Sequence, residues 1–439
     1  QKYMWRNFTG RGFWLLAAVY LVLLLFFTGT YGGLKIGYLK PMDVFFSQVL
    51  SLIFTNVISY FQISLLSLKL VTAYPLILMT LVQVGISAVW VFICQSFYRQ
   101  LFPPRKLLLI SGNRPIEDIL HKFESRRDKY EVVRCVREEL GQKALEQEIL
   151  ERYDGIVLWD INTGLRNKLL KFCYSRSIRV YMMPKIPDIM IQGASQLHLF
   201  DTPILFTREY SMTVEQRFVK RAIDIICSLI LIIITSPIMI ITSVIIKCYD
   251  HGPVLYKQVR CTRNMEEFKI VKFRSMRTDA EKDGVARLAS KNDDRITPIG
   301  KFIRKVRIDE LPQLFNILKG EMSFIGPRPE RPEIAAEYEE VMPEFRLRLQ
   351  AKAGLTGYAQ VYGKYNTTPY DKLKLDLFYI ENYSFFLDLK LLLMTVKIFF
   401  QKEVSEGVDD DQINALKDSV EEITREDIRH DGTENREPK

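Results

Sequence analysis

The sequence has few of the residues that commonly build metal or nucleophile sites. It holds six cysteines in 439 residues and no C-x-x-C pair, which argues against disulfides and a structural zinc site. Its four histidines lie outside the motifs described below, so no histidine-based triad is expected. A signal-peptide cleavage pattern is also absent after the apolar runs near the start of the chain, and these runs are therefore interpreted as membrane anchors.

A glycine-rich dinucleotide loop is missing as well. Short apolar runs at residues 105–113, 130–136, 153–161 and 178–184 alternate with helical stretches, which predicts a parallel sheet with crossover helices over residues 101–212. The first strand-to-helix turn reads Ser-Gly-Asn-Arg-Pro, without the glycines that let a backbone close on a pyrophosphate. The expectation is a Rossmann-like α/β domain with a regulatory or assembly role.

Long apolar runs, in contrast, are abundant. Residues 13–27, 44–66 and 74–97 predict transmembrane helices within residues 1–100, and the last two runs are long enough to span about 30 Å of hydrocarbon. A later apolar stretch, residues 385–400, carries Asp388, Lys390 and Lys397, which favours an interfacial amphipathic helix.

The net charge of +9 is unevenly distributed. Residues 403–439 form an acidic tail with 13 acids and 5 Lys or Arg, so residues 1–402 carry a net charge of +17. A basic body beside membrane segments suggests anionic lipid headgroups or a phosphorylated substrate as partners. The alternative is that the excess only sets the membrane topology. Nucleic acid is not an expected partner.

A fourth apolar run, residues 222–246, predicts either a spanning helix or a re-entrant one. Basic residues flank it on both sides, so both ends are expected in the cytoplasm. Ser236-Pro237 stands in the middle, where proline removes a helix hydrogen bond and a bend is expected. A broken helix over residues 217–248 that enters one leaflet and returns fits both observations, with Ser236 able to cap a freed backbone group.

Two adjacent acids, Asp309 and Glu310, stand among basic residues just before Pro312. Because proline is tolerated in a first helical turn, a helix is expected to begin near Leu311, with both acids at its entrance. Consecutive side chains point in different directions, so one carboxylate could hold Mg²⁺ beside a bound diphosphate while the other attacks phosphorus. A simple capping role is the alternative.

Candidate phosphate ligands lie on both sides of the acids. Lys272 and Arg274 in KFRSM, together with Arg304, are predicted phosphate clamps, and each could also be an ordinary surface charge. In Gly326-Pro327-Arg328-Pro329, two prolines stiffen the backbone around Arg328, which either presents one guanidinium or only shapes a turn. The glycine-rich AGLTGYAQVYG at 353–363 either approaches a ligand closely or joins two elements.

Taken together, these motifs resemble the bacterial sugar transferase family, the polyprenol-phosphate hexose-1-phosphate transferases or monotopic phosphoglycosyl transferases. The resemblance covers residue 219 to about residue 400 and rests on segments in the family's order: KRAIDIICS with Ser236-Pro237, GPVLYKQVR, KFRSMR, RITPIGKFIRK, DELPQLFNILKGEMSFIGPRPE and AGLTGYAQVYG. The apolar helices and the α/β domain resemble the long members of the family. The resemblance implies an α+β catalytic domain at residues 213–402 containing the re-entrant helix.

The resemblance also implies roles for single residues. Asp309 would be the nucleophile that takes a sugar-1-phosphate from a UDP-sugar, and Glu310 would bind Mg²⁺ beside Asp309. Arg304 and Lys272 would hold phosphates, while Arg328, between Pro327 and Pro329, would help bind the uridine nucleotide. Undecaprenyl phosphate would then attack the aspartyl-phosphosugar.

The same resemblance places the reaction in a cell. It implies undecaprenyl-diphospho-sugar and UMP as products, in the first step of capsule or exopolysaccharide synthesis. The site would face the cytoplasm at the bacterial inner membrane, in a multi-pass protein that forms a homodimer. YGKYNTTPYDKLKLDL at 362–377 is similar to members that prime with glucose or galactose, and the sequence does not choose between these sugars.

Some residues depart from the family pattern. Residues 261–265 lack the usual glycines, and Ala353 stands where proline is common, so loop shape is in doubt while the acid pair is not. Two other functions were weighed. A catalytically silent membrane scaffold or sensor is the main alternative, and a dehydratase or epimerase in the α/β domain would need the missing glycine-rich loop.

Overall fold

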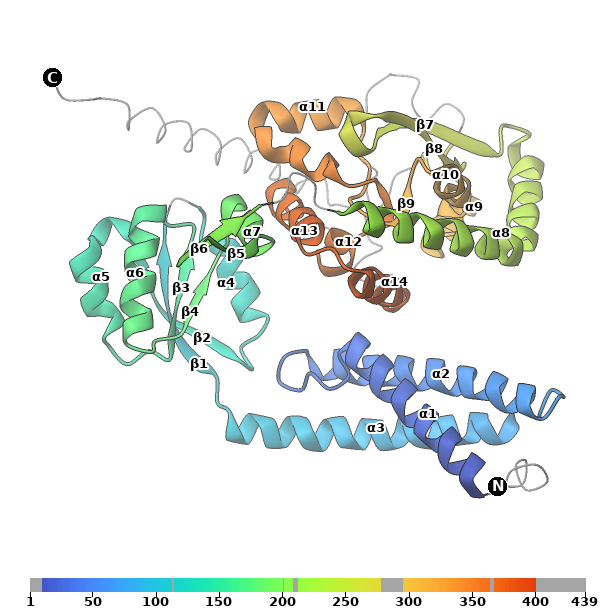
Figure 1. Ribbon diagram of the computed structural model, residues 1–439, viewed down its shortest axis with the longest axis horizontal. Helices are drawn as coiled ribbons and strands as arrows, with labels where there is room; N and C mark the ends of the chain where they lie inside the picture. The colour runs from blue at the N-terminus through green and yellow to red at the C-terminus, as the bar shows by residue number, and fades with distance from the viewer. Residues whose placement is uncertain are drawn as a thin grey trace. The chain divides into compact units, whose positions relative to one another are not determined.

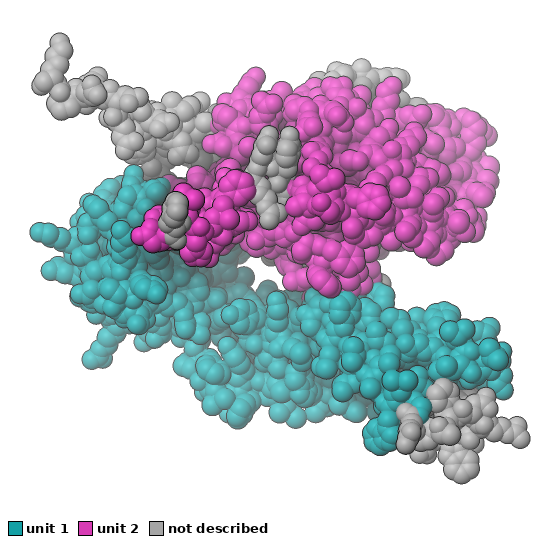
Figure 2. Space-filling model, in the orientation of Figure 1, with its two compact units in different colours: residues 1–183 teal, residues 184–439 magenta. Residues whose placement is uncertain are grey.

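The computed structural model describes residues 10–112, 114–199, 201–207, 212–277, 295–363 and 367–399. The chain divides into two compact units, residues 1–183 and 184–439 (Figure 2). The predicted acidic tail at 403–439 lies outside the described residues.

The first unit opens with three long apolar helices, α1 (Gly10–Tyr31), α2 (Pro41–Leu66) and α3 (Tyr74–Leu101). All three are long and apolar enough to cross a membrane, as the sequence predicted. A polar network joins them: the Tyr20 hydroxyl donates to Asn56 Oδ1 at 2.9 Å, and Asn56 Nδ2 donates to Gln83 Oε1 at 2.9 Å. Gln83 Nε2 closes the ring by donating to the Tyr20 hydroxyl at 2.8 Å. Polar side chains that hydrogen-bond to one another across helices help to hold membrane helices together.

A parallel four-stranded sheet follows, which confirms the predicted α/β pattern. Its strands lie in the order β2-β1-β3-β4. The elements are β1 (Arg105–Ser111), α4 (Glu117–Glu124), β2 (Tyr130–Arg137), the 3-10 turn η1 (Glu138–Leu140), α5 (Gln142–Ile149), β3 (Gly155–Trp159), α6 (Thr163–Ser175) and β4 (Val180–Met182). Alternate residues of β1 face opposite sides of the sheet. Leu108 and Ile110 pack toward α5 and α6, and Leu107 and Leu109 pack toward α4, so helices cover both faces (Figure 1).

The second unit begins with a segment that the sequence predicted to be part of the α/β domain. It contains α7 (Ile186–Gln192) and a two-stranded antiparallel hairpin, β5 (Ser195–Leu199) and β6 (Thr202–Phe206). Ile186 and Ile189 of α7 belong to the hydrophobic core of the second unit, where α7 packs on α13 (Pro369–Glu381). The division at residue 183 therefore differs from the predicted domain boundary at residue 212.

The rest of the second unit is a mixed α and β fold around that core. Its elements are α8 (Val214–Asp250), β7 (Leu255–Cys261), η2 (Arg263–Met265), β8 (Glu267–Phe273), α9 (Pro298–Lys305), η3 (Ile308–Glu310), α10 (Gln313–Lys319), β9 (Ser323–Ile325), α11 (Pro332–Val341), η4 (Pro343–Gln350), β10 (Gly354–Thr356), α12 (Tyr358–Tyr362) and α14 (Phe385–Phe399). Strands β7 and β8 form an antiparallel pair. A short parallel pair, β9 and β10, was not predicted.

Helix α8 is 37 residues long, contains Pro237, and changes direction along its length (Figure 1). Near its start, Arg221 donates to the carbonyls of Ile317 and Leu318 at 2.6 and 2.7 Å, which caps the C-terminal end of α10. Near its end, Asp250 pairs with Arg274 of the turn after β8. Both ends of α8 are thus attached to the same fold.

An ion pair fixes α8 against α14. Lys220 Nζ donates to Asp388 Oδ2 at 2.6 Å, and the Tyr379 hydroxyl of α13 donates to Asp388 Oδ1 at 2.7 Å. All three side chains are largely buried. Their mutual hydrogen bonds offset the free-energy cost of burying the two charges and the hydroxyl.

Candidate active site

The acid pair lies on a tight turn between two short helices. Helix α9 ends at Lys305, and Arg307 then adopts a left-handed conformation (φ 58°) that turns the chain sharply into η3, which carries Asp309 and Glu310. Pro312 is the N-cap of α10, so a helix does follow the acids at about the predicted position. A non-glycine residue with positive φ is uncommon, and its strain is held by the elements on either side.

Glu310 lies at the centre of three cationic side chains. Its Oε1 is 3.8 Å from Nζ of Lys272. The same oxygen is 3.5 Å from Nη1 of Arg307 and 3.5 Å from Nη2 of Arg328. Burial alone would raise the pKa of the Glu310 carboxyl, but the three cations outweigh it and lower that pKa to about 2. These cations therefore favour the ionised form of Glu310.

Asp309 has a different environment. Burial and the neighbouring Glu310 charge raise the pKa of Asp309 to about 6, against the opposing effect of Lys272 and Arg304. Among the described residues, Asp309 Oδ1 and Arg304 Nη1 are buried without a hydrogen-bond partner. A buried carboxylate oxygen without a partner, and more basic than usual, is suited to attack an electrophile.

Lys272 reaches the acids from β8. Asn316 of α10 sets the position of that strand, because its Oδ1 accepts from the backbone N–H of Val271 at 3.0 Å and its Nδ2 donates to the carbonyl of Lys269 at 2.9 Å. Burial lowers the pKa of Lys272 to about 8, with Glu310 opposing the change.

Arg274, two residues beyond Lys272, has a different partner. It is buried against Asp250, and its guanidinium lies so close to Gly252 that an added Cβ there would clash with it. The structure thus joins Lys272, Arg304 and Arg328 to the acid pair, while Arg274 holds the end of α8. The phosphate-binding roles of all four residues stay predictions.

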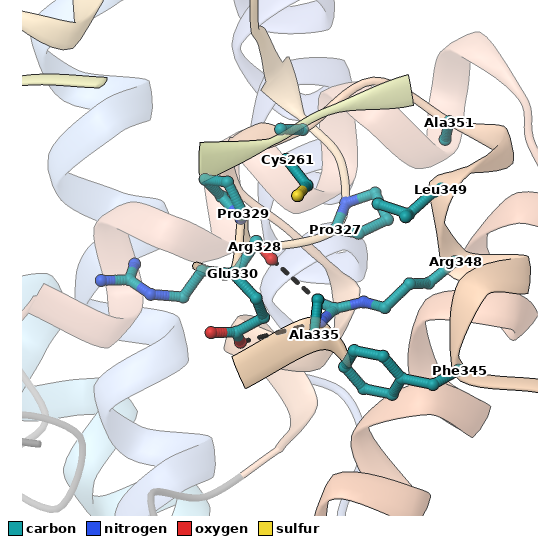
Figure 3. Close-up of a pocket in the computed structure, with 11 residues that line it drawn as sticks. Cys261, Pro327, Arg328, Pro329, Glu330, Ala335, Phe345, Arg348, Leu349 and Ala351 are labelled. Carbon is teal, nitrogen blue, oxygen red and sulfur yellow. Dashed lines mark hydrogen bonds and ion pairs between the residues drawn. The ribbon is translucent and has the colours of Figure 1, made fainter. Parts of the chain in front are cut away.

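Residues 327–330 line a small pocket of about 10 Å³, roughly the space of a single water molecule (Figure 3). Arg348 of η4 points into the pocket and donates to the carbonyl of Arg328 at 2.9 Å. The Arg328 side chain points the other way, out of the pocket (Figure 3), and it is 43% exposed. The two prolines therefore flank an arginine whose backbone is fixed and whose side chain is accessible.

The glycine-rich segment at 353–363 approaches backbone atoms of this same fold. A Cβ on Gly354 would lie 2.2 Å from the backbone N of Gly326, and one on Gly357 would lie 2.1 Å from its carbonyl oxygen. The glycines therefore let β10 and the turn after it pack directly against the Gly-Pro-Arg-Pro segment.

Sequence reasoning missed several residues of this site. Arg307 is one of the basic residues beside the acids and Arg260 is one of those after the apolar run at 222–246, and the sequence predicts a site role for neither. Arg348 and Asn316 were not singled out, because a lone arginine or asparagine in a helix carries no local signal of its long-range partner.

Comparisons with known proteins show what the region that contains the site is similar to. The family described as "Bacterial sugar transferase" matches residues 215–402, which contain every site residue discussed above. The chain is 36% identical over 255 residues to the UDP-N-acetylgalactosamine-undecaprenyl-phosphate N-acetylgalactosaminephosphotransferase of Aeromonas hydrophila, covering 56% of this chain and 59% of that one. It is 40% identical over 204 residues to the undecaprenyl-phosphate glucose phosphotransferase of Komagataeibacter xylinus, covering 43% of this chain and 38% of that one.

A shorter relative is matched almost along its full length. The exopolysaccharide production protein PSS of Rhizobium leguminosarum bv. phaseoli is 40% identical over 186 residues, which are 40% of this chain and 92% of the relative. The chain belongs to the bacterial sugar transferase family. It spans less than two thirds of the two longer relatives named above.

Proposed function

We propose that the protein transfers a hexose-1-phosphate from a UDP-sugar to undecaprenyl phosphate, giving undecaprenyl-diphospho-sugar and UMP. The reaction would start the synthesis of a capsular or exopolysaccharide. The names of the longer relatives support the acceptor and the type of transfer. They carry different sugars, N-acetylgalactosamine and glucose, so the predicted choice of glucose or galactose stays open.

One observation carries the proposal: the positive charge around the carboxylate pair exceeds what is needed to neutralise the two carboxylates. Two acids stand against four cations, which are Lys272, Arg304, Arg307 and Arg328. The surplus suits a ligand with two negative phosphates, and arginine and lysine both bind phosphate well. The unpartnered Asp309 Oδ1 supplies the nucleophile in the same place.

The chemistry follows in two displacements. Asp309 Oδ1 attacks the phosphorus that bears the sugar, and the bond from this phosphorus to the UMP oxygen breaks. A phosphate oxygen of undecaprenyl phosphate then attacks the aspartyl-phosphosugar, and the bond to Asp309 breaks, which restores the carboxylate. Arg328 and Lys272 would neutralise charge on the phosphates as UMP leaves.

The carboxylate pair also fits Mg²⁺. The described residues contain no cluster of three or more His, Cys, Asp or Glu that could hold a metal alone. Mg²⁺ is commonly held by one or two carboxylates together with substrate phosphates, so Glu310, with the carboxylate of Asp309 beside it, would hold the ion. When bound, Mg²⁺ would reduce repulsion between the acids and the diphosphate.

We further propose that α8 is re-entrant and that the site faces the cytoplasm at the inner membrane. A straight helix of this length would extend roughly 55 Å, so its ends would lie on opposite sides of a bilayer. Both ends instead hold the same catalytic fold, through Arg221 and Asp250. Met239 and Ile246 also pack in one cluster with Ile308, beside the acid pair.

Two further expectations stay predictions. The Rossmann-like character and the regulatory or assembly role of the α/β domain rest on the sequence pattern, and the homodimer rests on the resemblance alone.

The test is UMP release by the full chain in lipid nanodiscs with undecaprenyl phosphate and Mg²⁺. UDP-glucose, UDP-galactose and UDP-N-acetylgalactosamine should be supplied separately, and at least one should give UMP that depends on the lipid acceptor. Failure with every UDP-sugar, in protein that remains folded, would favour the silent scaffold. The preferred donor would identify the sugar.

A further inference from the structure

The backbone of residues 327–330 is anchored at four successive carbonyls. The N–H of Gly354 donates to Pro327 O at 2.9 Å, and the N–H of Cys261 donates to Glu330 O at 3.1 Å. Between them, Arg348 Nη2 donates to Arg328 O at 2.9 Å, and Arg260 Nη1 donates to Pro329 O at 3.1 Å. Two arginine side chains therefore hold the peptide groups that follow Arg328 and Pro329.

These two arginines are themselves neutralised by acids. Glu330 lies between them, with Oε1 at 3.7 Å from Arg348 Nη1 and Oε2 at 3.9 Å from Arg260 Nη1. Asp376 of α13 lies 2.7 Å from Arg348 Nη2 and is almost completely buried. Arg260 and Arg348 thus each pair with an acid of this set, whereas Arg328 directs its charge toward Glu310.

We propose that Arg260 and Arg348 are positioning residues, which fix the Arg328 backbone so that its guanidinium is directed at a nucleotide phosphate. This inference rests on the proposed function, because it assigns the ligand of Arg328 to the phosphate of a uridine nucleotide. Fixing the backbone lowers the entropy lost when the long Arg328 side chain binds its ligand. The planar guanidinium of Arg348 donates to a carbonyl and lies within ion-pair distance of two carboxylates at once, which a lysine ammonium cannot reproduce.

The experiment measures UMP affinity by isothermal titration calorimetry on the full chain in nanodiscs with Mg²⁺. Arg348→Lys keeps the charge but loses the planar contacts, and it should weaken UMP binding by about tenfold. Arg260→Lys should act in the same direction. Arg346→Lys is the matched control, since Arg346 is an exposed residue of the same 3-10 helix, and it should bind UMP like the wild type.

A double-variant cycle separates positioning from general support. Arg328→Ala should also weaken UMP binding, and adding Arg348→Lys to it should cause little further loss, because the residue that Arg348 positions is already gone. Additive losses would overturn the proposal, and so would wild-type UMP affinity in the Arg348→Lys protein. If Arg348→Lys does not fold, Asp376→Asn replaces it, since the amide has nearly the same shape and removes the charge that faces Arg348.

The outcomes also distinguish this inference from the proposed function. If the wild-type protein binds UMP but releases none from any UDP-sugar, the transferase reaction is contradicted. The positioning role of Arg348 is then still decided by the UMP affinities of the variants. A wild-type protein that releases UMP, with Arg348→Lys unchanged in affinity and in KM for the UDP-sugar, contradicts only the inference.

Discussion

The hydroxyl of Ser236 donates a 2.8 Å hydrogen bond to the carbonyl of Ile233. In a regular helix that carbonyl would accept from the N–H of residue 237, which proline lacks. Ser236 therefore satisfies the acceptor that Pro237 leaves open. Without it, this carbonyl would have no hydrogen-bond donor, which is costly in apolar surroundings.

Ser236→Ala should destabilise the protein by about 1 kcal/mol. Ser243→Ala is the matched control, because Ser243 makes the same kind of bond, to Met239 O at 2.7 Å, in a part of α8 where no proline removes the backbone donor. Its cost should be smaller. Unfolding midpoints in nanodiscs would check the difference, and equal losses would contradict the role given to Ser236.

Re-entrance predicts that both ends of α8 are accessible from the same side of the membrane. Cys248 is an exposed native reporter at one end, and Phe218→Cys, at a side chain that is 74% exposed, supplies the other. A membrane-impermeant maleimide should label both in inside-out vesicles and neither in right-side-out ones. Cys173 is an internal control: burial raises its thiol pKa to about 11, so it should stay unlabelled at neutral pH. Labelling of the two ends from opposite sides would refute re-entrance.

Asp309→Asn should abolish transfer, because an amide cannot form the aspartyl-phosphosugar. We expect UMP release to fall by about 10³-fold or more, together with loss of a radiolabelled sugar-phosphate adduct on the protein. Glu333→Gln, at an exposed acid of α11, is the control and should retain activity. Turnover of Asp309→Asn at the wild-type rate would remove the basis for the mechanism.

The ion pair between Lys220 and Asp388 should matter for stability. Asp388→Ala leaves the Lys220 ammonium and the Tyr379 hydroxyl without their shared acceptor, and should destabilise the fold by roughly 3 kcal/mol. Replacing both charged residues, as Lys220→Met with Asp388→Leu, should recover part of this loss. Thermal unfolding of the three proteins would show it, and a double variant less stable than Asp388→Ala would contradict the argument.

Asn56 should stabilise the membrane helices through hydrogen bonds rather than through packing. Asn56→Ala removes its bonds to Tyr20, Thr80 and Gln83, at about 0.6 kcal/mol each for bonds between membrane helices, so a loss of about 2 kcal/mol is expected. Ser59→Ala on the same helix is the control, since the buried Ser59 hydroxyl has no hydrogen-bond partner among the described residues. Denaturant midpoints in detergent would compare the two.

Local patterns were enough to predict much of the fold. Apolar length gives α1 to α3, and alternation of short apolar runs with helical stretches gives the parallel sheet, because both depend on nearby residues. The acid pair and Arg328 could be singled out for a similar reason: proline fixes the chain next to each, which is visible in the sequence. Their meeting at 3.5 Å, 18 residues apart, is a product of tertiary packing.

Long-range partners could not be predicted in this way. Arg274 is a residue type that often binds phosphate, yet it pairs with Asp250, which lies 24 residues earlier in the chain. No local pattern distinguishes it from Lys272. Arg307 adopts a left-handed backbone that its residue type disfavours, so a sequence rule would not place the turn there. The parallel pair of β9 and β10 is also hidden, since three-residue strands have no measurable periodicity.

The docking of α7 on α13 has a practical consequence for anyone who trims this protein. A fragment that begins at residue 213, two residues before the family match, would lack Ile186 and Ile189 of the core. The hydrophobic face of α13 that they cover would then be exposed to water. A soluble, folded catalytic fragment should therefore start no later than Pro184, and the shorter fragment should aggregate.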